Sequence, residues 1–107
     1  MKEEHDALVE VTLLKTEQGG RDSPIFCGYR GCHLIKEDYL TSSSMKFIND
    51  EMISPGDTRL ALVQYITPEV YPASLWVGKK MNLQEGSKVI GYTVVKEVYN
   101  NTLIKGT

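Results

Sequence analysis

The chain has 107 residues, of which 41% are hydrophobic and 24% are charged, and this content suits a single domain with one hydrophobic core. Its formal net charge of -2 excludes a protein that attracts nucleic acid through an overall positive field. The charged start of the sequence lacks an apolar signal segment, and no apolar run approaches the roughly 20 residues that cross a bilayer. We therefore expect a cytoplasmic protein with no membrane contact.

The first strand is predicted at residues 7–13, where every second residue is apolar, as is typical of a half-buried strand. Gly19-Gly20 supplies two positions that accept positive φ, so we expect the chain to reverse there and to return antiparallel. Residues 25–35 carry aromatic and β-branched side chains. They predict one long strand, kinked at Gly28 and Gly31.

The middle of the chain gives a weaker pattern. Residues 36–49 are polar with little periodicity, and they predict a loop that carries one short strand at residues 45–48. Ser54-Pro55-Gly56-Asp57 places Pro and Gly at the central positions of a type II turn. Residues 60–66 should form the next strand. Because its apolar residues fall on both faces, we expect burial on one face and coverage by a loop or a partner on the other.

The last third of the chain predicts a loop and a hairpin. Two prolines within residues 67–72 remove ladder donors, so this segment should connect strands. Residues 81–84 alternate, residues 85–87 read as a hairpin turn, and residues 89–99 predict a long strand. One face of that strand is expected to carry Ile90, Tyr92, Val94 and Val98.

Together these segments predict an all-β fold. Five or six antiparallel strands, closed or nearly closed into a small barrel, would leave few exposed sheet edges. The sequence shows no internal repeat and no second domain. We expect one domain with its core at residues 7–99 and with tails at residues 1–6 and 100–107.

The sequence carries no motif that predicts catalysis or a cofactor. Gly78-Lys79 matches the Gly-Lys pair near the end of the phosphate-binding P-loop motif. However, Ala73 replaces the first glycine of that motif, and Lys80 replaces the Ser or Thr that binds magnesium. The two cysteines are a poor zinc signature. Cys32 and His33 are neighbours in a predicted strand and should point to opposite faces. We expect no enzyme, no bound nucleotide and no metal.

A small group of basic residues is the one feature that suggests contact with phosphate. These residues fall near predicted hairpin ends, and they are Arg21, Arg30, Lys79, Lys80 and Lys88. Such a group permits a phosphate contact without requiring one. A solvated basic edge is the commoner explanation, and both alternatives stay open.

Residues 17–30 carry a specific pattern: an acidic residue, one residue, Gly-Gly-Arg, two residues, Pro, two apolar residues, one residue and Gly-Tyr-Arg. Pro55-Gly56-Asp57 follows, and residues 85–91 read Glu-Gly-Ser-Lys-Val-Ile-Gly. In order and spacing, roughly residues 7–99 resemble the C-terminal domain (domain III) of bacterial elongation factor Tu. The resemblance implies a closed six-stranded antiparallel barrel that stands alone, without a GTPase domain.

The resemblance also implies two functional surfaces. One contacts the backbone of aminoacyl-tRNA in the family. The matching positions here are Arg21, Cys32, Thr41, Glu85 and Lys88. The other faces the GTPase domain. Its positions here are Gly19, Gly20 and Asn82.

Two replacements weaken the RNA-facing side. The family has Gln at the position of Cys32 and Arg at that of Lys88, so this chain lacks an amide and a bidentate guanidinium there. We therefore predict a non-catalytic module that binds a protein partner linked to translation, a translation factor or one of its ligands. The alternatives are a tRNA- or RNA-binding module and a domain fragment without independent activity.

Overall fold

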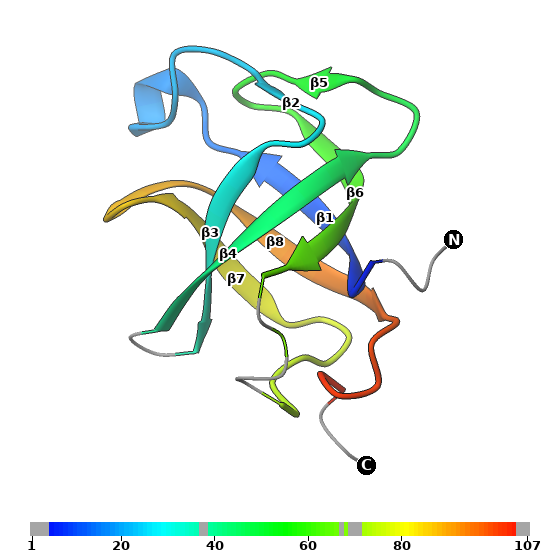
Figure 1. Cartoon of the computed structure of the whole chain (residues 1–107). Helices are drawn as coiled ribbons and strands as arrows, with labels where there is room; N and C mark the ends of the chain where they lie inside the picture. Colours follow the sequence, from blue (N-terminus) through cyan, green and yellow to red (C-terminus); the bar gives the residue numbers. More distant parts are fainter. Residues whose placement is uncertain (1–4, 37–38, 67, 69–71, 105–107) are drawn as a thin grey trace.

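The computed structural model describes residues 5–36, 39–66, 68 and 72–104. Its main strands are β1 (Ala7–Leu13), β3 (Arg30–Lys36), β4 (Tyr39–Phe47), β6 (Thr58–Tyr65), β7 (Lys80–Glu85) and β8 (Lys88–Val98). They form a closed barrel in the order β1-β6-β4-β3-β7-β8, and every neighbouring pair is antiparallel (Figure 1). The predicted fold class, a small closed antiparallel barrel of six strands, is confirmed.

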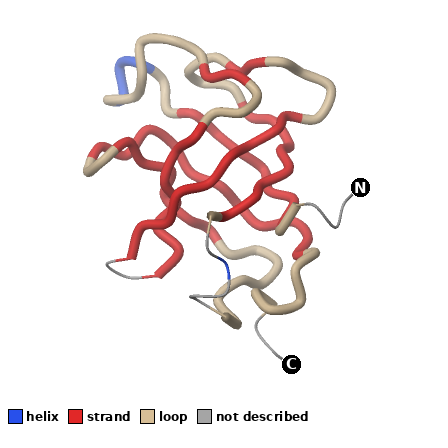
Figure 2. Tube along the Cα trace, in the orientation of Figure 1, coloured by secondary structure: helices blue, strands red, loops and turns tan. Residues whose placement is uncertain are grey.

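Shorter elements lie at the ends of the barrel. A second sheet pairs β2 (Ile25–Phe26) with β5 (Met52–Ile53), and a 3-10 turn, η2 (Thr16–Gln18), lies at the same end. Figure 2 shows the strands crossing the middle of the molecule and loops gathered above and below them. No helix among the described residues is long and apolar enough to span a bilayer.

Alternating side chains fill the barrel. Along β1, the inward residues Ala7, Val9, Val11 and Leu13 are at most 1% exposed, which confirms the strand predicted at residues 7–13. Full burial of a large aliphatic side chain stabilises a fold by about 1.5–3 kcal/mol. The largest fully buried aliphatic side chains on the barrel strands are Leu13, Ile35, Met45, Met81, Leu83 and Ile90.

The segment predicted as a polar loop with a short strand at residues 45–48 is instead β4, a strand of nine residues. That prediction was wrong because β4 turns polar side chains inward. Thr41 and Ser43 are each only 4% exposed. Ser43 Oγ lies 2.8 Å from Nδ1 of the buried His33, so these two polar atoms are paired inside the barrel. A strand with a partly polar inner face lacks the apolar alternation that identifies strands in a sequence.

The single kinked strand predicted at residues 25–35 is divided into two strands of different sheets. A tight turn separates them, in which the Tyr29 N–H donates to the Phe26 carbonyl oxygen at 2.9 Å. The chain leaves β2 at this turn and enters the barrel as β3. The prediction of one strand was therefore wrong, and the turn brings Tyr29 to the rim of the barrel.

The side chains of β8 that share one face also differ from the prediction. The β7–β8 register shifts between Leu83 and Gln84, and the β1–β8 register shifts between Leu8 and Val9. Each shift inserts an extra residue into β8 and reverses which face the following residues occupy. The residues that turn toward the core are therefore Ile90, Thr93, Val95 and Val98, whereas Tyr92 and Val94 lie on the outer side.

The predicted turns at residues 54–57 and 85–87 are confirmed, whereas the strand after Gly19-Gly20 does not return along β1, since β2 pairs with β5. Gly56 has a positive φ of 93°, and the Asp57 N–H donates to the Ser54 carbonyl oxygen at 2.9 Å. Gly86-Ser87 joins β7 to β8 as a two-residue hairpin loop. The loop predicted at residues 67–72 falls mostly outside the described residues.

The predicted tails contribute to the packed domain. The Asp6 carboxylate accepts a hydrogen bond from the Tyr65 N–H at 2.7 Å and another from the Asn100 side-chain amide at 2.9 Å. Leu103 is fully buried in the main core. Parts of both tails therefore fasten the ends of β1, β6 and β8, and the other tail residues lie outside the described ones.

Candidate protein-binding surface

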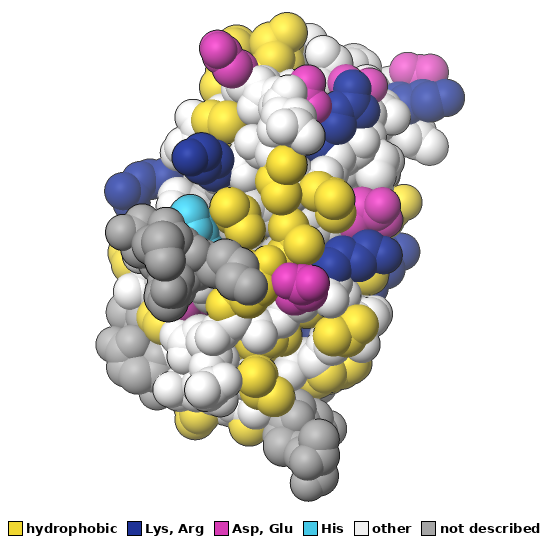
Figure 3. Space-filling view, turned by 90° about the vertical axis from the view of Figure 1, so that its right-hand side faces the viewer, with side chains coloured by type: hydrophobic (Ala, Val, Ile, Leu, Met, Phe, Trp, Pro, Cys, Tyr) yellow, Lys and Arg dark blue, Asp and Glu magenta, His cyan; other side chains and the backbone are white. Residues whose placement is uncertain are grey.

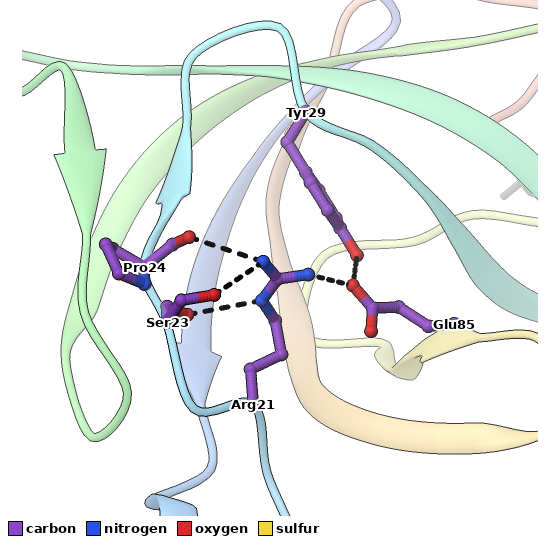
Figure 4. Close-up of polar contacts among 5 residues, drawn as sticks. All are labelled: Arg21, Ser23, Pro24, Tyr29 and Glu85. Carbon is purple, nitrogen blue, oxygen red and sulfur yellow. Dashed lines mark hydrogen bonds and ion pairs between the residues drawn. The ribbon is translucent and has the colours of Figure 1, made fainter.

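Three residues from two distant parts of the chain form a polar cluster at the barrel rim, the Arg21–Tyr29–Glu85 cluster (Figure 4). The Tyr29 hydroxyl donates to Glu85 Oε2 at 2.6 Å, and Arg21 Nη1 forms an ion pair with the same oxygen. The Arg21 guanidinium also lies 5.6 Å from the centroid of the Tyr29 ring. The cluster thus joins the segment before β3 to the end of β7.

Arg21 is further engaged by its own loop. Its Nε donates to the Ser23 carbonyl oxygen at 3.2 Å, and its Nη2 donates to Ser23 Oγ at 3.0 Å and to the Pro24 carbonyl oxygen at 3.5 Å. Because these contacts occupy most of the donors of one guanidinium, Arg21 holds the loop before β2 against the β7–β8 hairpin.

The cluster fixes the charge state of its members. The hydrogen bond from Tyr29, together with the Arg21 guanidinium, lowers the pKa of Glu85 below its ordinary value. Partial burial and the adjacent carboxylate raise the pKa of Tyr29 well above its ordinary value. At neutral pH Glu85 is therefore an ionised carboxylate, and Tyr29 is a neutral phenol that donates its proton in a hydrogen bond. These are the charge states that the Arg21–Glu85 ion pair and the Tyr29 hydrogen bond require.

Removing the phenol hydroxyl tests this arrangement. We expect Tyr29→Phe to raise the pKa of Glu85 toward the ordinary value for glutamate, because the hydrogen bond from Tyr29 is the largest cause of the lowering. A pH titration of the Glu85 carboxyl followed by NMR measures the change. Tyr92→Phe, on the outer side of β8, is the matched control, and an unchanged Glu85 titration in Tyr29→Phe would contradict the arrangement.

An apolar surface adjoins the cluster. Phe26 and Met52 are cross-strand partners in the small β2–β5 sheet, and their side chains are 58% and 44% exposed. Beside them the chain from Arg21 to Tyr29 lines a hollow of about 530 Å³. Exposed apolar groups rimmed by polar ones are typical of protein contact sites. We call the exposed pair and this hollow the Phe26–Met52 surface.

The three positions assigned to a protein interface by resemblance do not form one surface. Gly19 and Gly20 follow η2 and lead directly into Arg21, so they border the cluster. Gly20 packs closely against the chain, since a Cβ atom there would lie 2.5 Å from the Leu14 carbonyl oxygen. Asn82 lies on β7 opposite Tyr92, on the outer side of the barrel wall.

The positions assigned to RNA contact are divided as well. Glu85 pairs with Lys88 across the hairpin and binds Arg21, so these three lie together. Cys32 lies along the barrel wall, with its Sγ 4.0 Å from Ser42 Oγ. Thr41 is 4% exposed and lies opposite His33, so its side chain points into the barrel rather than to an accessible surface.

The basic residues considered for phosphate contact are divided between places: Arg21 and Lys88 lie together beside Glu85, whereas Lys79 and Lys80 lie at the other end of β7. Lys79 donates to the Ile35 and Ser74 carbonyl oxygens, and its ammonium lies 4.7 Å from the centroid of the Trp76 ring. The Lys80 ammonium lies 4.1 Å from the centroid of the Tyr92 ring. Lys79 comes directly before β7 and Lys80 is its first residue, whereas Lys88 comes after its last residue. The two ends of β7 are roughly 17 Å apart along the strand.

The structure also shows a Ser–His pair that the sequence analysis missed. Ser43 Oγ and His33 Nδ1 are within hydrogen-bond distance, but both side chains lie inside the barrel. Such a pair activates a nucleophile only where a substrate can reach it. Over the described part of the chain, no three His, Cys, Asp or Glu side chains are placed to hold a metal ion.

No protein-family model matches the sequence. The resemblance to elongation factor Tu therefore rests on the residue pattern alone. The Arg21–Glu85 ion pair joins the two segments that carry that pattern, although its members are 64 residues apart. This contact could not be foreseen from either segment alone, because only barrel closure brings them together.

Proposed function

We propose that this barrel is a non-catalytic module that binds a protein partner linked to translation. The single observation that carries the proposal is the exposed Phe26–Met52 pair beside the Arg21–Tyr29–Glu85 cluster. Aromatic and methionine side chains are enriched in protein interfaces, and a rigid polar rim limits the entropy lost on binding. The link to translation comes from the resemblance of this same region to elongation factor Tu.

The arrangement of the polar residues supports a binding role over a catalytic one. The Ser43–His33 pair is enclosed, and the Glu85 carboxylate is committed to Arg21 and Tyr29. Neither group is placed to exchange a proton with a bound substrate. A binding module requires no such exchange.

A pulldown tests the proposal. The tagged protein is incubated with a bacterial lysate, with and without nuclease, and the recovered proteins are identified by mass spectrometry. We expect recovery of a translation factor that resists nuclease. The double variant Phe26→Ala/Met52→Ala should lower that recovery about tenfold, because exposed anchors of this kind dominate binding free energy.

The matched control is Val77→Ala, which truncates a residue that is 68% exposed and lies outside the Phe26–Met52 surface. It should leave recovery unchanged. Recovery of no translation component, or equal losses in both variants, would contradict the proposal. Recovery of tRNA that declines steeply as salt rises would favour the RNA-binding alternative instead.

A further inference from the structure

One row of residues crosses four strands on the outer side of the barrel. Lys46 of β4 pairs with Leu62 of β6, Leu62 pairs with Leu8 of β1, and Leu8 pairs with Glu97 of β8. Paired residues in antiparallel strands point to the same side of a sheet. The row therefore presents one basic, two apolar and one acidic side chain in that order, and we call it the Lys46–Glu97 row.

The row lies on the outer surface of the barrel, and its β4–β6 part borders a hollow that His5 lines together with Lys46 and Leu62. Lys46 and Glu97 are exposed, Leu62 and Leu8 are half-buried, and Leu60, two residues before Leu62 on β6, is 40% exposed. Figure 3 shows apolar side chains gathered in the middle of one side of the molecule, with charged side chains beside them. The strand predicted at residues 60–66 is β6 (Thr58–Tyr65), and one of its faces was expected to need cover by a loop or a partner. His5 lies beside Leu62 on that face, and Leu60 stays exposed among the described residues.

The order of charges along the row restricts what can cover it. Two copies can face each other across a two-fold axis that runs parallel to the strands and passes between β6 and β1. In that arrangement the row of the second copy runs in the opposite direction to the row of the first. Lys46 then lies opposite Glu97 of the other copy, and Leu62 lies opposite Leu8. Such an isologous contact requires a surface that is complementary to itself, and the Lys46–Glu97 row meets that requirement.

We propose that this face binds a second copy of the chain and forms a two-fold symmetric dimer. The neighbouring row contains Leu60, Glu10 and Val94, and the same operation places Leu60 against the methylene groups of Glu10. The four-strand row is only about 14 Å wide at ordinary strand spacing, and the barrel curves away on both sides. We therefore expect a weak dimer, with a dissociation constant in the micromolar range.

Sedimentation equilibrium of the purified full chain from about 1 µM to about 500 µM measures the dimer, because this range spans a micromolar dissociation constant. We expect Lys46→Glu and Glu97→Lys each to weaken dimerisation by at least about tenfold, since each places like charges together at two symmetric contacts. The double variant Lys46→Glu/Glu97→Lys should restore the wild-type dissociation constant, because the charges are exchanged and remain complementary.

Lys15→Glu is the matched control, since it changes the net charge as Lys46→Glu does but lies beyond the far end of β1. It should leave the dissociation constant unchanged. Circular dichroism checks that every variant is folded. A protein that stays monomeric over the whole range, or a double variant no better than the single ones, would overturn the proposal and assign this face to another occupant.

Discussion

Acidification from about pH 7.5 to about pH 4 is expected to lower the free energy of unfolding by about 3 kcal/mol through His33 alone. His33 is fully buried in the barrel, and burial lowers its pKa from the ordinary 6.5 to about 4. Its Nδ1 lies 2.8 Å from Ser43 Oγ, and its ring packs edge-on against Tyr65 with centroids 5.5 Å apart. Neither neighbour carries a negative charge that would stabilise the imidazolium ion.

The direction follows from proton binding in the two states. Between about pH 6.5 and pH 4 the unfolded chain protonates His33, whereas the folded barrel keeps the ring neutral. The unfolded state therefore gains stability as the pH falls through this window. Above the window both states are neutral and below it both are protonated, so His33 adds no further pH dependence there.

Urea unfolding at a series of pH values measures the effect. The experiment uses a His5→Asn background, which removes the only other histidine of the chain. His33→Asn keeps a polar group near the position of Nδ1 for Ser43 but cannot titrate. It should be less stable at pH 7.5, because ring packing is lost, and its stability should decline less on acidification. Equal declines in the two proteins would show that His33 is not protonated on unfolding.

The barrel was predictable because most of its strands face an apolar core. In β1, every inward residue is apolar and fully buried, and the outward residues between them are only half-buried. The apolar residues at every second position are therefore visible in the sequence. In the β7–β8 hairpin, Gly86-Ser87 identifies the turn as well. Such local signals suffice where one strand face is wholly apolar.

The missed features depend on contacts between distant residues. β4 looked like a loop because Ser43 is polar, and only its pairing with His33 shows that it belongs inside. The bulges in β8 arise from the registers with β1 and β7, which no single strand specifies. The candidate surface was missed for the same reason, since Phe26 and Met52 meet only in the β2–β5 sheet.

Replacing Gly91 by alanine is expected to destabilise the barrel by about 3 kcal/mol, at the upper end of overpacking effects. Gly91 pairs with Leu13 of β1 on one side and Leu83 of β7 on the other. A Cβ atom at residue 91 would lie 2.2 Å from the Thr12 carbonyl oxygen and 3.2 Å from the Leu13 Cα. Both are backbone atoms, so no rotamer change can relieve the clash.

Gly78→Ala is the control that separates the steric clash at residue 91 from the general backbone cost of replacing a glycine. Gly78 has a φ of 95°, and a Cβ atom there would meet no other group within 4 Å, so alanine costs only the left-handed backbone, about 1–2 kcal/mol. Urea unfolding of both variants measures the difference. Because closing the barrel requires β8 to approach β1 closely at Gly91, Gly91→Ala should be the less stable variant, and equal stabilities would contradict that close approach.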